Sequence, residues 1–303
     1  MTATDANAEA IAAPRESDLS RGPKLLLALP YAEVRLDQTP STAPGDPRPL
    51  GRQLRAATVG PIDVLPGLTG RGVHRLERDG AVRWRWTAGF GPIFVPLPEG
   101  YEPTDIRVDG QPVDAVRIVD LVNNAGSYLS SDGSGGDVGY EAPDGGDFDE
   151  PADRFAACGA AMVMPAHVIR AVGPMASNFF AYYEDTDWCW RAQLAGFRIR
   201  YEPAGLVRHV RWATSGGPSS EFASLLAARN RILTLVRNAP RERYHEEVAK
   251  ALGSDEPPGI RRSLTRRLPV ARLERARLGR RWVRSPVDVW ERWAGVNDRW
   301  SEG

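Results

Sequence analysis

The residues with the greatest potential for chemistry lie in one segment, FFAYYEDTDWCWRAQLAGFRIRYEPAGLVRHVRWATSG, which spans residues 179–216. Four aromatic residues precede the acids Glu184, Asp185 and Asp187, and His209 follows them. Carboxylates beside aromatic bulk are poorly hydrated, and desolvation raises the pKa of an acid. Such an arrangement predicts either the capping of a helix or proton transfer by a carboxylate.

The capping explanation needs no ligand. On a helix that begins near Asp185, Asp187 and Arg191 are four residues apart and pair on one face. Glu184 and Asp185 then precede the helix, where carboxylates accept hydrogen bonds from free backbone N–H groups and are stabilised by the positive end of the helix dipole. These residues alone leave both explanations open.

Strands and helices alternate through this part of the chain. Helices are predicted at AHVIRAVG, at DTDWCWRAQLAG, which Gly196 closes, and at SSEFASLLAARNRILTLVRNAP, which has a serine N-cap and ends before Pro240. Strands are predicted at FAACGAAMVMP, at FRIRYEP and at AGLVRHV. This alternation predicts α/β packing.

The chain before this part is predicted to be rich in antiparallel strands. Residues 1–22 are polar and predict a disordered leader. In the β-rich segment 23–116, PKLLLALPYAEVRLD predicts a buried strand followed by an edge strand or turn, and the Asp-Gly pairs at 79–80 and 109–110 predict hairpins. The Gly-, Asp- and Ser-rich stretch 123–155 predicts a long loop without packed elements.

Composition limits the classes of protein to consider. The formal net charge is zero, so the total charge predicts no attraction to nucleic acid or membrane. The two cysteines, Cys158 and Cys189, are too few for a disulfide framework, lack the spacing of a metal site and fit a reducing cytoplasm. Cys158 is interpreted as a core residue. The early apolar stretch LLLALP is too short to cross a bilayer, so we expect a soluble or peripheral protein.

The order of these features resembles a known family. The aromatic run, Glu-Asp-x-Asp, the Gly-terminated helix, the strand RYEP, then His209 and finally ARN at 228–230 resemble the acceptor-side half of an actinobacterial-type family 2 glycosyltransferase with the GT-A fold. The stretch VNNAGSYLSSDGSGGDVGYEAPDGGDFDEPADRFAACGAAMVM resembles the part that precedes the acidic motif in such enzymes. The resemblance implies a partial GT-A-like α/β core at 117–240, between the β-rich segment and a helical basic tail at 241–303.

The resemblance also implies a reaction. A family member of this type transfers a sugar from a nucleotide-sugar donor to a glycan or lipid-linked acceptor by an inverting single displacement. Asp185 matches the base of the family, and Glu184 would position the acceptor or the base. Asp187, Trp188 and Arg191 would contact or support the acceptor, although Trp188 equally fits a core position.

Two further residues match positions that serve the diphosphate in the family. His209 matches a histidine that helps to hold the divalent metal, and its alternative is a histidine satisfied at a strand end. Arg229 matches a basic position that faces phosphate, and its alternative is a solvated helix residue. The implied cofactor is Mg²⁺ or Mn²⁺, because hard cations take oxygen ligands and neutralise phosphate charge.

The donor half of the family has no counterpart that we find in this sequence. Members open with a nucleotide-binding strand and carry an Asp-x-Asp after a later strand. The two Asp-x-Asp strings here, at 147–149 and 185–187, do not follow a strand in that way, so we discount both as the metal site. We therefore expect a donor half that is missing, degenerate or supplied by a partner chain. The alternative hypothesis is a non-catalytic glycan-binding or scaffolding module derived from a glycosyltransferase.

The tail from 259 to 284 is strongly basic. Ten arginines face only Glu274, and leucines at 264, 268, 273 and 278 lie between them, which predicts an amphipathic helix. One interpretation is a solvated helix packed along the domain. The other is contact of residues 259–285 with an anionic membrane at the inner face of the plasma membrane. Nucleic-acid binding is not favoured, since the arginines lack interleaved aromatic residues over most of the stretch.

Overall fold

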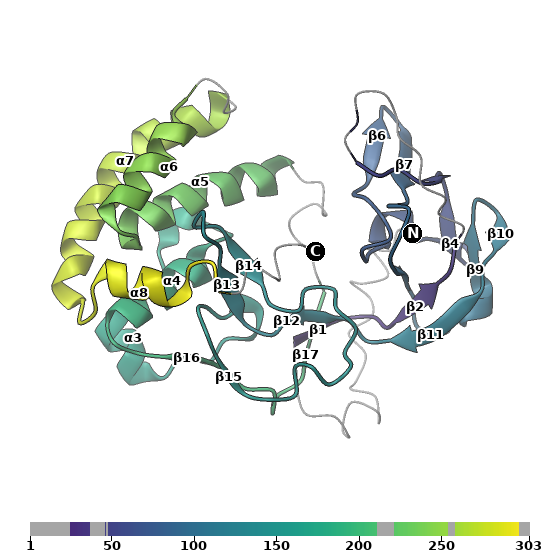
Figure 1. Ribbon diagram of the computed structural model, residues 1–303, viewed down its shortest axis with the longest axis horizontal. Helices are drawn as coiled ribbons and strands as arrows, with labels where there is room; N and C mark the ends of the chain where they lie inside the picture. The colour runs from purple at the N-terminus through teal and green to yellow at the C-terminus, as the bar shows by residue number, and fades with distance from the viewer. Residues whose placement is uncertain (1–24, 37–45, 47, 211–220, 254–257, 297–303) are drawn as a thin grey trace. The chain divides into compact units, whose positions relative to one another are not determined.

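The computed structural model describes residues 25–36, 46, 48–210, 221–253 and 258–296. They form two compact units: unit 1 takes its residues from 1–123, 140–148 and 206–219, and unit 2 from 124–139, 149–205 and 220–303. The fold is mixed α/β, with several small sheets and a set of helices (Figure 1). The leader predicted at 1–22 lies outside the described residues.

Unit 1 is built from short strands around a buried apolar core. Strand β2 (Tyr31–Val34) pairs antiparallel with β11 (Ala115–Val119) on one side and with β8 (Ile93–Pro96) on the other. The prediction of an edge strand here is wrong. Both edges of β2 are hydrogen-bonded to neighbouring strands, and three of its four side chains are buried.

Both predicted Asp-Gly hairpins are confirmed in unit 1. The first joins β6 (Glu77–Asp79) to β7 (Val82–Trp86), and the second joins β9 (Ile106–Val108) to β10 (Gln111–Pro112). In the second, Asp109 and the glycine after it have φ angles of +49° and +79°, the left-handed values of a tight two-residue turn. The other short strands of this unit are β3 (Gln53–Leu54), β4 (Ala57–Val59) and β5 (Ile62–Asp63).

One small sheet of unit 1 contains the predicted strand AGLVRHV. Strand β17 (Val207–His209) pairs in parallel with β1 (Leu25–Leu27), and β12 (Val122–Asn124) completes the order β12-β1-β17. His209 is opposite Leu27 in this register.

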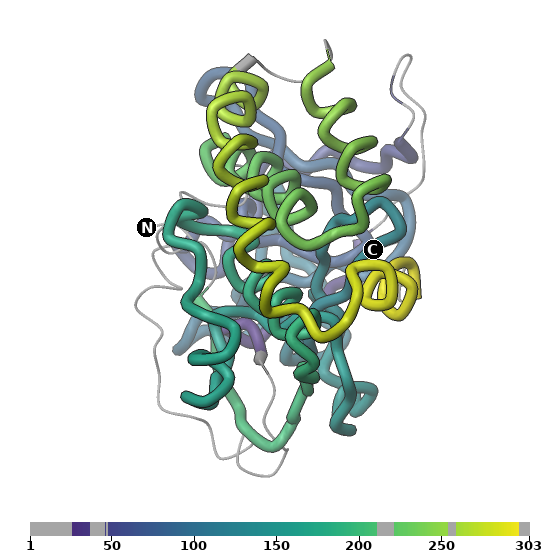
Figure 2. The backbone as a smooth tube through the Cα atoms, turned by 90° about the vertical axis from the view of Figure 1, so that its left-hand side faces the viewer, coloured from purple at the N-terminus to yellow at the C-terminus, as the bar shows by residue number. Residues whose placement is uncertain are grey.

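Unit 2 contains the helices and its own core. The predicted helices are confirmed as α3 (Ala166–Val172) and α4 (Glu184–Leu194), and α5 (Glu221–Asn238) carries the third, whose serine N-cap lies outside the described residues. The chain continues through α6 (Arg241–Ala251), α7 (Pro258–Leu278) and α8 (Pro286–Trp293). Figure 2 shows unit 2 from the side on which α6, α7 and α8 lie, with α8 in yellow. One continuous core joins α3 to α8, and Trp190 at its centre is fully buried.

Two predictions in unit 2 are wrong. The stretch FAACGAAMVMP forms no strand but a 3-10 turn at Gly159–Ala161, because glycine and alanine offer a sheet little side-chain surface to pack. The predicted loop 123–155 is instead ordered: β13 (Ser127–Leu129) pairs with β14 (Gly135–Asp137), and β15 (Ala152–Arg154) pairs with β16 (Ile199–Tyr201). Polar side chains of this segment also form hydrogen bonds with its backbone. For example, Asn124 Oδ1 accepts a hydrogen bond from the Gly126 N–H at 2.7 Å.

Candidate functional site

The acids Glu184 and Asp185 lie in the first turn of α4, not before it as predicted. Asp185 Oδ1 accepts a hydrogen bond from the Thr186 N–H at 2.7 Å, and its Oδ2 accepts one from the Gly159 N–H at 2.8 Å. Backbone donors from two separate segments therefore fix this carboxylate. A carboxylate oxygen can accept more than one hydrogen bond, so Asp185 can bind a further donor.

Glu184 has a different environment from its neighbour. Burial raises the pKa of Glu184, and the negative charge of Asp185 raises it further. Its Oε2 atom is buried and has no hydrogen-bond partner among the described residues. A carboxyl group whose pKa is raised stays protonated to a higher pH, so Glu184 can donate a hydrogen bond where an ordinary glutamate is ionised.

A third acid, Asp137 at the end of β14, has hydrogen-bond donors of its own. Its Oδ1 accepts hydrogen bonds from Asn124 Nδ2 at 2.6 Å and from Ser127 Oγ at 3.2 Å. Burial, followed by the charges of Asp137, Asp185 and Glu184, raises the pKa of the Cys158 thiol to about 12. That thiol is therefore protonated at neutral pH, which argues against a nucleophilic role and agrees with the sequence interpretation.

The aromatic run before α4 has a strained backbone. Phe180, Tyr182 and Tyr183 have φ angles of +68°, +66° and +68°, values that L-residues with large side chains rarely adopt. At Phe180 the ψ angle is −65°, and the Ala181 N–H donates to the Phe179 carbonyl at 2.9 Å, which closes a strained three-residue γ-turn. Such strain persists only where surrounding contacts impose it, and it concentrates at functional sites.

Asn230 of α5 imposes this conformation. Its Nδ2 group donates to the carbonyls of Phe179, Ala181 and Tyr182 at 3.1, 2.8 and 2.8 Å. Arg229 Nε donates to Asn230 Oδ1 at 2.8 Å, which fixes the orientation of the amide. We refer to these two α5 residues as the Arg-Asn clamp. Sequence reasoning noticed the ARN motif but missed this function, because its partners are backbone atoms nearly fifty residues away.

Asp187 lies on the opposite side of α4 from solvent and belongs to the core. It is fully buried and accepts hydrogen bonds from Arg191 Nε at 2.8 Å, Arg237 Nε at 2.7 Å and Asn238 Nδ2 at 2.8 Å. Burial by itself raises the pKa of Asp187, but the charges of Arg237 and Arg191 outweigh it and leave that pKa lowered. The predicted pairing of Asp187 with Arg191 is confirmed, and it places both residues in a structural role.

Two other candidates from the sequence, Trp188 and His209, have hydrogen-bond partners that do not belong to the acid pair. Trp188 is almost fully buried and donates from Nε1 to the Gly173 carbonyl at 2.8 Å, so its ring faces the core and not a ligand. His209 belongs to unit 1, where its Nδ1 is 3.0 Å from Asn123 Oδ1. This contact matches the alternative of a histidine satisfied at a strand end.

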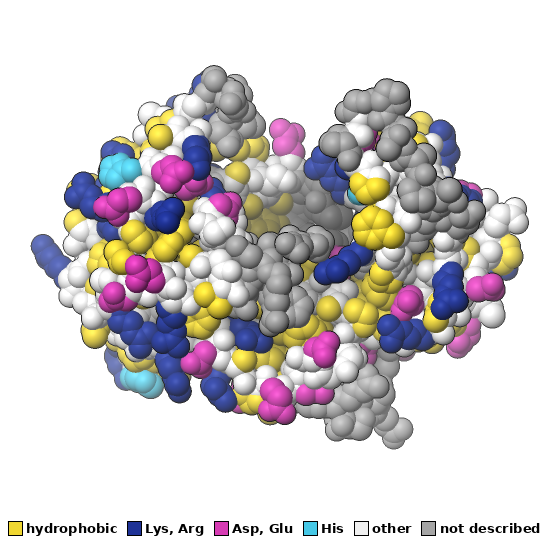
Figure 3. Space-filling view, viewed as in Figure 1, with side chains coloured by type: hydrophobic (Ala, Val, Ile, Leu, Met, Phe, Trp, Pro, Cys, Tyr) yellow, Lys and Arg dark blue, Asp and Glu magenta, His cyan; other side chains and the backbone are white. Residues whose placement is uncertain are grey.

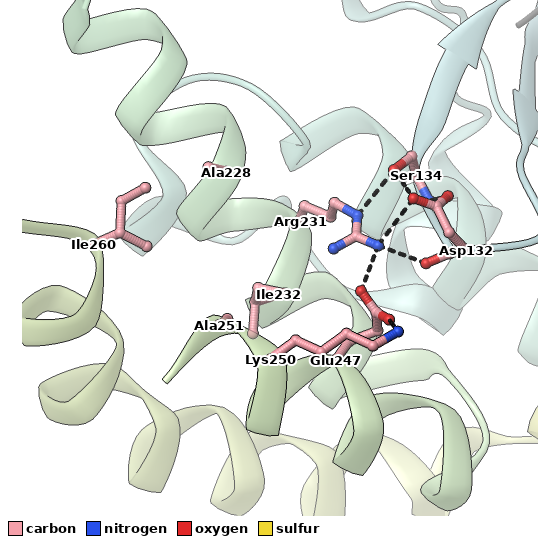
Figure 4. A pocket seen from close by; sticks show the side chains of 9 residues that line it. All are labelled: Asp132, Ser134, Ala228, Arg231, Ile232, Glu247, Lys250, Ala251 and Ile260. Atoms are coloured by element: carbon pink, nitrogen blue, oxygen red, sulfur yellow. Dashed lines mark hydrogen bonds and ion pairs between the residues drawn. The ribbon is translucent and has the colours of Figure 1, made fainter. Parts of the chain in front are cut away.

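A pocket of about 480 Å³ opens beside the hairpin that carries Asp137 (Figure 4). Arg231 of α5 crosses its floor, donating to Ser134 Oγ at 2.9 Å and to Glu247 Oε2 at 2.7 Å. Apolar side chains of α5, α6 and α7, including Ile232 and Ile260, line the other wall. Tyr183 connects this hairpin to the strained loop, because its Oη accepts the Gly135 N–H at 3.1 Å.

The described residues contain no group of three or more His, Cys, Asp or Glu side chains placed to hold a metal ion. We derive no step through the Mg²⁺ or Mn²⁺ that the family resemblance implies. Within the same residues, no helix is both long enough and apolar enough to span a bilayer.

Comparison with known proteins adds no identification: no family model, no curated protein and no solved structure matches this chain.

Proposed function

We propose that unit 2 is the acceptor side of an inverting glycosyltransferase of the family 2 type, and that Asp185 is its general base. The observation that supports this best is the fixation of the Asp185 carboxylate by the backbone N–H groups of Gly159 and Thr186, directly after a strained loop. A general base must be held within hydrogen-bond reach of the hydroxyl that it deprotonates. Rigid support of this kind is what such positioning requires.

The proposed step follows from that placement. The acceptor hydroxyl transfers its proton to Asp185 while its oxygen forms a bond to the anomeric carbon of the donor sugar. The bond from that carbon to the diphosphate oxygen breaks, and its electron pair leaves with the nucleoside diphosphate, so the configuration inverts. Glu184, whose pKa is raised by burial, stays protonated to a higher pH and donates a hydrogen bond that orients the acceptor.

The nucleotide-sugar donor needs a binding region that the described residues do not supply in recognisable form. We propose that a partner chain provides this donor half, together with any Mg²⁺ or Mn²⁺ that neutralises the diphosphate. The acceptor in this proposal is a glycan or a lipid-linked saccharide.

A second candidate is a non-catalytic glycan-binding module. It is supported by two exposed aromatic side chains, Phe180 at the γ-turn and Phe222 at the start of α5, which are 79% and 58% exposed. Their ring centroids are 6.2 Å apart in an edge-to-face arrangement. Exposed aromatic groups that contact each other are typical of binding surfaces, and such a surface needs no proton transfer at Asp185.

Measurement of transfer and binding on the same variants distinguishes the two candidates. The full chain is incubated with UDP-, GDP- and dTDP-sugars and a panel of saccharides. A lysate of the source cells, depleted of this chain, is added to supply the proposed partner. We expect transfer that Asp185→Asn lowers by a factor of about 100 to 10,000, the usual contribution of a general base. Saccharide binding, followed by saturation-transfer NMR, is expected to change by no more than about tenfold, because the amide keeps the size of the carboxylate and loses only one of its two backbone hydrogen bonds.

The paired readouts give every result a meaning. Transfer that is unchanged in Asp185→Asn contradicts the assignment of the base. Saccharide binding without transfer, lost in Phe180→Ala and Phe222→Ala, supports the binding module. Absence of both transfer and binding contradicts both candidates.

A further inference from the structure

One sheet of unit 1 has two unlike faces. Its strand order is β3-β7-β6, and successive side chains of the central strand, Val82–Trp86, point to opposite sides. Arg85 and its neighbour on β3, Leu54, are both buried, and Leu54 belongs to the apolar core of the unit. Because side chains alternate, Trp84 and Trp86 lie on the outer face of this sheet.

The outer face is aromatic and partly open. Trp84 and Trp86 are both partly exposed, and in the part of the chain that the structure describes neither packs against the core that contains Leu54. Side chains two residues apart on a strand are about 7 Å from each other, so the two indole rings are neighbours. Val82 continues the same row and is 51% exposed. Apolar side chains that gather on an accessible surface are typical of a binding site.

The acid Glu77 of β6 fixes one of the two rings. It lies opposite Trp84 in the register of β6 and β7, which are side by side in Figure 1, and its Oε2 accepts a hydrogen bond from Trp84 Nε1 at 3.1 Å. Its Oε1 accepts one from Arg48 Nη1 at 2.7 Å. Arg48 is held in turn by Asp46, to which its Nε donates at 2.9 Å. This network fixes a ring, a carboxylate and a guanidinium group beside one another.

Other polar groups of the face remain available to a ligand. Trp86 Nε1 makes no hydrogen bond to any described residue. Gln53 lies opposite Trp86 on β3, and only its Oε1 is used, which accepts a hydrogen bond from Arg55 Nε at 3.1 Å. Asp79 lies opposite Val82, is exposed, and forms no hydrogen bond or ion pair within the described ranges. The face therefore combines two rings with free donors and a free acceptor.

We propose that the outer face of the β3-β7-β6 sheet binds a neutral saccharide. The C–H groups of a pyranose ring carry a slight positive charge, and they pack on the electron-rich faces of indole rings such as those of Trp84 and Trp86. Each sugar hydroxyl both donates and accepts, so hydroxyls match the free N–H groups of Trp86 and Gln53 and the carboxylate of Asp79.

The charges of the face favour a neutral ligand over an anionic one. Glu77 and Asp79 are both acids of this face, and Arg48 is already matched by Asp46 and Glu77. A nucleic acid or another polyanion would instead need unmatched basic groups. The face belongs to unit 1 and shares no residue with the acid pair of unit 2, so the inference goes beyond the proposed function and does not rest on it.

The test applies the full chain to an array of neutral oligosaccharides of glucose, mannose and galactose, and calorimetry measures the affinity of those that are retained. Trp86→Ala is expected to weaken binding by about tenfold or more, because it removes a stacking ring and a free donor. Phe90→Ala is the matched control, since Phe90 is a 62% exposed aromatic residue of the same unit outside the three strands. Its affinity should change by no more than about twofold. Circular dichroism verifies folding.

Should Trp86→Ala fail to fold, Gln53→Ala replaces it, because that change removes a partly exposed polar side chain. It is expected to weaken binding by about fivefold, the effect of one neutral hydrogen bond. Equal weakening by Phe90→Ala would reveal adhesion through any exposed ring and overturn the proposal. Retention of no neutral oligosaccharide at millimolar concentration would overturn it as well.

Variants of unit 2 separate this proposal from the proposed function. Asp185→Asn, Phe180→Ala and Phe222→Ala are expected to leave retention on the array unchanged. Binding that is lost in the two phenylalanine variants and kept in Trp86→Ala would assign the saccharide to unit 2 and overturn the proposal. Absence of sugar transfer, together with binding that depends on Trp86, would count against the proposed function only.

Discussion

At the scale of single residues, Glu184 is the clearest case of a group whose ionisation opposes folding. Its carboxyl is partly buried beside Asp185, and its Oε2 has no hydrogen-bond partner in the described part of the chain. The pKa in the folded state is raised above the unfolded value of 4.5. The free energy of unfolding therefore falls as the pH rises through the folded pKa, because the unfolded chain loses the proton first.

We expect Glu184→Gln to remove this pH dependence. Below pH 4 the variant and the unchanged protein should have nearly equal stability, since the carboxyl is protonated in both states. Between that pH and neutrality the variant should become the more stable of the two. Chemical denaturation at a series of pH values measures this difference, and Glu291→Gln, an exposed glutamate of α8, is the control. Equal stability of variant and unchanged protein at all pH values would show that Glu184 is adequately solvated.

The residue scale also marks the limit of sequence reasoning at this site. The pairing of Asp187 with Arg191 could be predicted because helix geometry fixes a spacing of four residues. Arg237 and Asn238, which complete the network around Asp187, are some fifty residues away and no spacing rule reaches them. Asp137 was missed for the same reason.

At the scale of elements, the strained loop depends on the donors of the Arg-Asn clamp. Asn230→Asp keeps the shape of the side chain but puts an oxygen opposite the carbonyls of Phe179, Ala181 and Tyr182. We expect it to lower the free energy of unfolding by about 3 kcal/mol, because hydrogen bonds become repulsions in a buried place. Urea denaturation followed by tryptophan fluorescence measures this loss.

Asn230→Ala separates donation from space filling. If the clamp acts through its N–H groups, the near-isosteric Asn230→Asp is at least as destabilising as Asn230→Ala. If Asn230 only fills space, the aspartate variant is clearly the milder of the two, and our account of the loop is wrong. Crystal structures of the variants would show whether Phe180 leaves the γ-turn.

Elements differed in how well the sequence predicted them. The helices α3 and α4 and both Asp-Gly hairpins follow from local signals, namely periodicity, a closing glycine and a turn pair, and all are confirmed. The segment 123–155 was predicted as a loop because its composition is typical of one. Strands β13 and β14 pair with each other inside the segment, whereas β15 forms because β16, outside it, supplies the hydrogen bonds. That information is not local, so composition could not reveal it.

At the scale of the whole molecule, the basic tail is part of the unit 2 core. Ile260, Leu264, Leu268 and Ala271 of α7 are buried in the same apolar cluster as α4 and α5. The apolar face of the helix is thus already occupied by the protein. On the face of unit 2 that Figure 3 shows, at the left, basic and acidic side chains are interspersed.

A second face of α7 remains available to a membrane. Arg262, Arg266, Val270, Leu273 and Arg277 are all exposed and share one side of the helix at its period of 3.6 residues. Exposed apolar side chains between arginines fit the boundary of an anionic bilayer, where the arginines reach the headgroups. We therefore expect the chain to float with phosphatidylserine-containing vesicles and not with phosphatidylcholine vesicles.

Replacement of Arg262, Arg266 and Arg277 by glutamine tests this face without removing buried residues, which deletion of 259–285 would do. Each basic residue near an anionic surface contributes about 1 kcal/mol, so the triple variant should lose most of its vesicle binding at physiological salt. The matched control replaces Arg71, Arg75 and Arg78, three exposed arginines of unit 1, and should bind as before. Equal loss in both triple variants would mean that net charge alone governs binding. Unchanged flotation of the α7 variant would remove this face from consideration and leave α7 with a purely structural role.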